Sequence, residues 1–199
     1  MMTTKSDPSK TAVAERTGFS ARSRVYPLIL CALFTALTGV FSFLSIPLPF
    51  TPVPVNLATL AVMLSGLLLG AKYGTLSQLV YLLAGAIGVP VFSGGSSGLG
   101  ILTGATGGYL IGYLLCAACC GAIAGNSRSP VRTVPAMIVG IAVCYTLGTL
   151  WYIHLTQVAL VPALLSCVLP FIPGDLLKIT AAAILVYRFP RGSFIRTIS

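Results

Sequence analysis

Acidic residues are almost missing from this chain, whose 199 residues include three Asp or Glu and one His. Only 8% of the residues are charged, whereas soluble domains carry about 25%. So little polar surface excludes a soluble protein. The motif HExxH does not occur and no two acids share an apolar segment, which argues against an intramembrane hydrolase. No Gly-Lys-Ser/Thr ends a phosphate loop, so we expect no nucleotide site and no cofactor.

Apolar residues dominate instead, at 56% of the chain with a mean hydropathy of +0.98. A helix needs about 20 such residues to cross a bilayer, and lipid excludes open sheet edges. We therefore expect an all-α integral membrane protein with six spans and short loops. The six apolar segments are Tyr26–Ile46, Val55–Gly70, Tyr73–Gly88, Gly108–Gly125, Val134–Tyr152 and Gly174–Tyr187. The polar tail 1–25 is predicted to be disordered, and residues 189–199 form a basic tail.

Basic residues indicate the orientation of these spans. Eleven of the twelve Lys and Arg lie outside them, and six crossings place all eleven on one side. The positive-inside rule then puts both termini in the cytoplasm. These residues are scattered singly, so the net charge of +9 favours contact with lipid and not with nucleic acid.

The three connections without Lys or Arg are expected outside. The first, residues 47–54, is rich in proline, and the second, 89–107, is rich in glycine. The third, 153–173, contains an apolar stretch at 160–171 that is too short to span and fits an interfacial or re-entrant helix. Restricted proline segments and close-packing glycine segments are suited to cover a small ligand.

The segment FIPGDLLKIT, residues 171–180, places Asp175 and Lys178 at the outer end of the last span. Pro173 suits a helix start, the first turn favours a carboxylate, and a residue three positions later shares its face. The pair either neutralises itself or binds a ligand. Because ionisable groups are costly in a membrane, we favour the ligand site.

Other candidates are less specific. The loop GSSGLG, residues 95–100, fails the dinucleotide template at Thr103, and we favour a ligand-facing cap flanked by Phe92, Ser93 and Tyr109. Asn56 either caps a helix or contacts the ligand. For the aromatic residues Tyr81, Tyr145 and Trp151 we favour a membrane-interface belt or a core position over a pocket. We favour a packing role for Cys116, Cys119 and Cys120, and a structural role for His154.

Three motifs carry a family resemblance. PLPFTPVPVNLATLAVMLSGLLLGAKYG, LVYLLAGAIGVPVFSGGSSGLGILTGATGGYLIGY and VLPFIPGDLLK occur in the order found in the BioY family, which the chain resembles over about residues 26–188. Those proteins are biotin-specific S components of energy-coupling factor (ECF) transporters. The resemblance implies biotin uptake across a bacterial cytoplasmic membrane, with a transmembrane coupling protein and two ATPase subunits as partners.

The resemblance also assigns residues. It implies that Asp175 and Lys178 hold biotin, with Lys178 meeting either its carbonyl or its carboxylate. It implies that Ala32 and Ala36 dock on the coupling protein, although this small-xxx-small pattern equally fits internal packing. The family often has glutamine where Ala58 stands, and Asn56 is a possible replacement. The alternatives are a self-sufficient biotin carrier, an intramembrane enzyme and a structural subunit without ligand.

Overall fold

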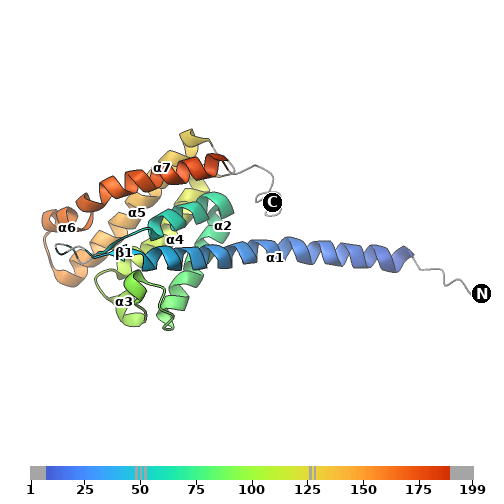
Figure 1. The fold of residues 1–199 in the computed structure, drawn as a ribbon, viewed down its shortest axis with the longest axis horizontal. Helices are drawn as coiled ribbons and strands as arrows, with labels where there is room; N and C mark the ends of the chain where they lie inside the picture. Colours follow the sequence, from blue (N-terminus) through green and yellow to red (C-terminus); the bar gives the residue numbers. More distant parts are fainter. Residues whose placement is uncertain are drawn as a thin grey trace, which may run out of the picture.

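The computed structural model describes residues 8–47, 49, 51, 53–125, 127 and 129–188, with side chains from residue 25 onward. Helices make up nearly all of this part of the chain (Figure 1). In chain order the elements are α1 Pro8–Phe43, β1 Ser45–Ile46, β2 Val55–Asn56, α2 Ala58–Ala86, η1 Ser93–Gly95, α3 Leu99–Thr103, α4 Gly107–Ala124, α5 Pro130–Thr156, α6 Leu160–Cys167, η2 Leu169–Phe171 and α7 Ile172–Arg188.

Five helical stretches of the described residues are long and apolar enough to cross a membrane. They are Val25–Phe43, Ala58–Ala86, Gly107–Ala124, Pro130–Thr156 and Leu160–Arg188. The second contains two of the predicted spans, because α2 breaks at Gly70, where φ is 78° and ψ is 174°. The Gln78 amide lies 3.0 Å from the Ser65 hydroxyl, thirteen residues away, so the chain reverses there. The bundle therefore has the six apolar helical segments that the sequence predicts.

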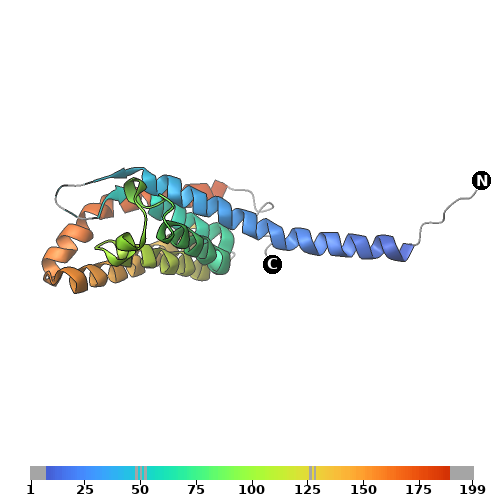
Figure 2. The ribbon, with the colours of Figure 1, turned by 90° about the horizontal axis from the view of Figure 1, so that it is seen from below.

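Helix α1 begins earlier than predicted. The structure has helix from Pro8, so residues 8–25 are helical where the sequence predicted disorder. Ala, Glu, Lys and Arg in this segment are strong helix formers, which allows the first span to continue as helix beyond its apolar part. Its N-terminal part projects past the rest of the bundle in both views (Figures 1 and 2). Residues 1–7 and the predicted basic tail 189–199 lie outside the described residues.

A two-stranded ladder at the other end of α1 was not predicted. Strands β1 and β2 pair antiparallel, with Ser45 opposite Asn56 and Ile46 opposite Val55. The prolines between them prevent the helix from continuing, so the backbone groups on either side pair with each other. The ladder fixes where α2 begins, and it starts at Ala58 instead of Val55.

The two ends of the bundle differ in charge. Lys72 follows the turn at Gly70, and α4 reaches this turn, because Gly121 faces the Ala71 backbone. Arg132 and Arg188 lie at the start of α5 and the end of α7. The opposite end carries β1, β2, α3 and α6. The apolar stretch in the third charge-free connection forms the short helix α6, as predicted.

Small residues let α2, α4 and α5 pack closely. A Cβ added to Gly66 would meet the Ala117 carbonyl of α4, and one added to Gly140 would lie 2.8 Å from the Cys120 sulfur. Close backbone approach through small residues is how membrane helices associate, since lipid supplies no hydrophobic driving force between them. Cys116 and Cys120 belong to this interface, in agreement with the packing interpretation.

Candidate functional site: a cavity beside the Asp175–Lys178 pair

The first turn of α7 brings Asp175 and Lys178 inside the bundle. Asp175 lies in that turn, where the helix dipole favours a carboxylate, and Lys178 follows three residues later on the same face. Both are buried, at 5% and 8% exposure, while Leu176 and Leu177 between them are exposed. The Lys178 Nζ lies 3.2 Å from Asp175 Oδ1, which forms a buried ion pair.

Two neutral hydroxyl groups form further hydrogen bonds with this pair. Tyr145 of α5 donates its phenolic hydrogen to Asp175 Oδ2. The Lys178 ammonium also donates to Thr59 Oγ1 of α2, at 3.0 Å. The pair thus ties α7 to both α5 and α2. A buried ion pair needs such additional hydrogen bonds because its own attraction barely offsets the cost of desolvation.

A cavity of about 230 Å³ lies beside the pair, so the ion pair does not simply neutralise itself in a packed core. The cavity combines aromatic and aliphatic walls with several hydroxyl groups, an amide and the two charges. This is the usual composition of a small-molecule site. Its walls are Val53, Pro54, Asn56, Thr59, Phe92, Ser93, Ser96, Ile101, Thr106, Tyr109, Leu110, Tyr113, Cys144, Tyr145, Phe171, Asp175 and Lys178.

All six residues that the sequence predicted to contact the ligand line this cavity: Asp175, Lys178, Asn56, Phe92, Ser93 and Tyr109. The structure shows one of the two roles left open for Asn56, the helix cap, while contact with the ligand stays a prediction. Its Oδ1 accepts from the Ala58 backbone N–H at 3.1 Å, which caps the start of α2. Its Nδ2 donates to Ser93 Oγ at 2.8 Å, which joins the proline-rich and glycine-rich connections across the cavity.

Glycines make room for the two aromatic walls. A Cβ on Gly148 would overlap the Tyr109 ring, and one on Gly85 would overlap the Phe92 ring. Tyr109 then reaches Thr149 with its hydroxyl, at 3.1 Å. Each ring is seated against helix backbone, so the shape of the cavity is set by packing and not by mobile side chains.

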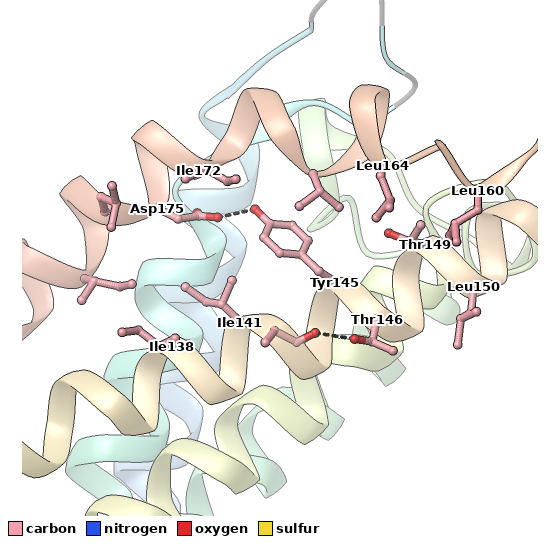
Figure 3. A pocket seen from close by; sticks show the side chains of 14 residues that line it. Ile138, Ile141, Tyr145, Thr146, Thr149, Leu150, Leu160, Leu164, Ile172 and Asp175 are labelled. Atoms are coloured by element: carbon pink, nitrogen blue, oxygen red, sulfur yellow. Dashed lines mark hydrogen bonds between the residues drawn. The ribbon is translucent and has the colours of Figure 1, made fainter. Parts of the chain in front are cut away.

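The sequence missed several wall residues, and Tyr145 is the most important of them. We favoured a belt or core position for it, but it bonds Asp175 (Figure 3). Its ring also meets Tyr109 edge-on, at 6.3 Å between centroids. Tyr145 lies within the apolar part of α5, so its position in the sequence did not indicate this role. Thr59, one residue after Ala58, was equally unremarkable in sequence.

The remaining candidates lie elsewhere. Tyr81 is fully buried and bonds Ser42, as a core residue does. The Trp151 indole donates to the Gly104 carbonyl at 2.9 Å and so anchors the glycine-rich connection. His154 is exposed near the end of α5. Ala32 and Ala36 lie exposed on the outer surface of α1, not in the core. In the described part of the chain, no three His, Cys, Asp or Glu side chains gather as a metal site would require.

Comparison with known proteins gives a consistent result. The model of the BioY family matches residues 10–193. The biotin transporter BioY of Thermotoga maritima is 37% identical over 167 residues, which cover 82% of this chain and 95% of that protein. The BioY of Rhizobium etli is 38% identical over 168 residues, covering 79% and 89%.

A solved structure is similar as well. The crystal structure of the S component for biotin from an ECF-type ABC transporter matches with a TM-score of 0.82 and 31% sequence identity. The match covers 89% of this chain and 98% of that one, so the likeness extends over the whole bundle and not only the site. On the family match, the relatives and the shared fold, this chain belongs to the BioY family.

Proposed function

We propose that this protein captures biotin at the outer face of the membrane for uptake into the cell and performs no chemistry on it. One observation carries the proposal. A carboxylate and an ammonium group lie 3.2 Å apart, both buried, on the wall of a cavity. The relatives and the solved structure, all of which are named for biotin, support the choice of ligand.

The chemistry of biotin complements this wall. Its ureido ring presents an N–H donor next to a carbonyl acceptor, while Asp175 offers only acceptors and Lys178 only donors. Because the two groups are adjacent, they meet the same end of the ligand, and the valeryl carboxylate is at the other end. We therefore assign the ureido carbonyl to Lys178 and a ureido N–H to Asp175. The aromatic walls Phe92 and Tyr109 suit the apolar part of the ligand.

The orientation follows from charge. Lys72, Arg132 and Arg188 lie at the end of the bundle opposite the elements that enclose the cavity. The positive-inside rule assigns that basic end to the cytoplasm, which leaves the cavity on the outer side. We assign the protein to the bacterial cytoplasmic membrane, a choice supported by the bacterial organisms of two of the similar transporters.

The chain has no nucleotide loop, so ATP can energise uptake only through partner proteins. We propose a transmembrane coupling protein and two ATPase subunits, as an ECF-type transporter implies. Ala32 and Ala36 form an exposed small-residue stripe on α1, where another helix could approach closely. The second candidate is a self-sufficient biotin carrier. Transport of biotin by the purified protein in vesicles without any ATPase decides for the carrier, and uptake only with the partners added decides for the ECF arrangement.

The binding itself is tested by titrating the purified protein with biotin, desthiobiotin and lipoate. Biotin and desthiobiotin share the ureido group, so both should bind saturably. Lipoate lacks it and should bind at least about a hundredfold more weakly, because the cavity-facing hydrogen-bonding positions of Asp175 and Lys178 then have no ligand partner. Equal affinity for lipoate, or no saturable binding of biotin, contradicts the proposal and favours a structural subunit. Biotin recovered unchanged after binding argues against an enzyme.

A further inference from the structure

A second hollow lies on the other side of Tyr145. It is a groove of about 590 Å³ between α5, α6 and α7 (Figure 3). Its walls are almost wholly apolar: Ile138, Ile141, Ala142, Tyr145, Thr146, Thr149, Leu150, Leu160, Leu164, Val168, Ile172, Asp175, Leu176 and Ile179. Leu150, Leu160, Leu164 and Leu176 are exposed, so the groove faces the lipid and not the bundle interior.

Only Tyr145 and Asp175 line both the groove and the polar cavity among the described residues. The Tyr145 side chain leaves α5 and points across to Asp175 on α7 (Figure 3). Its hydroxyl hydrogen bond therefore closes the gap between the two helices. The tyrosine ring and the bonded carboxylate together form the partition between the cavity that holds the charged pair and the apolar groove.

The same bond fixes the carboxylate. Lys178 holds Asp175 Oδ1 and Tyr145 holds Oδ2, from two different helices. A carboxylate held at both oxygens cannot rotate about its terminal bond, so its remaining lone pairs keep one direction. Such pre-organisation by a neighbouring side chain improves ligand affinity because less freedom is lost on binding.

Building on the proposed function, we propose that Tyr145 determines ligand specificity in two separable ways. Its hydroxyl positions Asp175 for the ureido N–H, and its ring denies substituted ureido ligands access to the apolar groove. The groove is then a latent subsite for an apolar substituent, which becomes available when the ring is removed.

Two variants separate the hydroxyl from the ring. Tyr145→Phe keeps the partition and removes only the hydrogen bond, while Tyr145→Ala removes both. Tyr152→Phe is the matched control, since Tyr152 is on the same helix but lines neither hollow in the described part of the chain. The ligands are biotin and biotin carrying a benzyl group on a ureido nitrogen. Both Tyr145 variants lack the hydroxyl, so the difference between them in the ratio of the two affinities reports the ring alone.

We expect Tyr145→Phe to weaken biotin binding about three- to tenfold, as loss of one buried hydrogen bond does, and to reduce the preference for biotin over the benzyl derivative by no more than that factor. Tyr145→Ala should reduce that preference at least about tenfold further than Tyr145→Phe does, because burial of a phenyl-sized group in the groove offsets the lost bond. Tyr152→Phe should match the unaltered protein both in its affinity for biotin and in its preference for biotin over the benzyl derivative.

Two results overturn the inference. Biotin binding by Tyr145→Phe at full strength removes the positioning role. Rejection of the benzyl derivative by folded Tyr145→Ala as strongly as by Tyr145→Phe removes the partition, and if Tyr145→Ala does not fold, Tyr145→Val is measured in its place. If the unaltered protein fails to bind biotin, the proposed function fails instead, and the two failures are thereby distinguished.

Discussion

The centre of the bundle and its last helix are held by different forces. In α4, 61% of the most apolar 18-residue window is buried inside the protein, against 22% in Leu160–Arg188, which includes α7. Glycines of α2, α4 and α5 face neighbouring backbone directly. By contrast, α7 buries a narrow stripe and reaches the bundle through Asp175 and Lys178, which bond Tyr145 and Thr59.

Because of this difference, the contacts that stabilise the fold and the groups that recognise the ligand lie largely in different parts of the molecule. Close packing of small residues leaves no space for a ligand, and it tolerates no added atoms. A helix attached by polar bonds leaves hollows on its flanks, and its charged groups remain within reach of a ligand. We infer that changes in the centre affect folding, whereas changes along the buried stripe of α7 affect binding with the fold intact.

The largest effect is expected at the centre. Gly121→Leu places a side chain against the backbone of Gly70 and Ala71, where no flexible atom can yield. Overpacking in a core costs about 1–3 kcal/mol or more, so we expect little folded protein and a clearly lower Tm in detergent. Gly100→Leu is the control, because a Cβ there meets nothing within 4 Å. Normal stability of Gly121→Leu would contradict the close-packed centre.

A smaller effect, confined to binding, is expected on α7. Asp175→Asn retains the shape but replaces a charge-assisted hydrogen bond, which is worth about 1.5–3 kcal/mol, so biotin affinity should fall at least about tenfold. Thr180→Ala serves as the control, since Thr180 is exposed on the same helix and bonds only the Leu176 carbonyl in the described structure. Titration of both purified variants checks this, and unchanged affinity in Asp175→Asn refutes a ligand role for the carboxylate.

The smallest effect is expected where α2 supports the site. Thr59→Val removes the hydroxyl that accepts from Lys178 but keeps the side-chain shape. One neutral partner is lost while Asp175 still holds the ammonium, so a decrease of about two- to tenfold in biotin affinity should follow. Thr59→Ser, which retains the hydroxyl, should restore it. A Thr59→Ser protein as weak as Thr59→Val would show that the methyl group matters and not the hydrogen bond.

Sequence reasoning located the charged half of the site because an acid inside an apolar segment is costly and therefore conspicuous. Only their spacing on one helix face was needed to predict that Asp175 and Lys178 lie together. Tyr145 and Thr59 were not found, since aromatic and hydroxyl residues occur throughout membrane helices and their partners lie 30 and 119 residues away. The sequence predicted one span on each side of Gly70, and so predicted that the chain reverses there. It did not predict the strand pair before α2.

The sequence by itself determined the class of protein, the number of apolar helical segments, the side that carries the basic residues and the ion pair of α7. These depend on composition and on neighbours three or four residues apart, which a chain displays directly. The tertiary structure alone decided that a cavity lies beside the pair, that Tyr145 lines both this cavity and the apolar groove, and that Asn56 bonds Ser93 of the glycine-rich connection. Such features arise where distant segments meet, and side-chain contacts between helices depend on rotation and depth that no local pattern encodes.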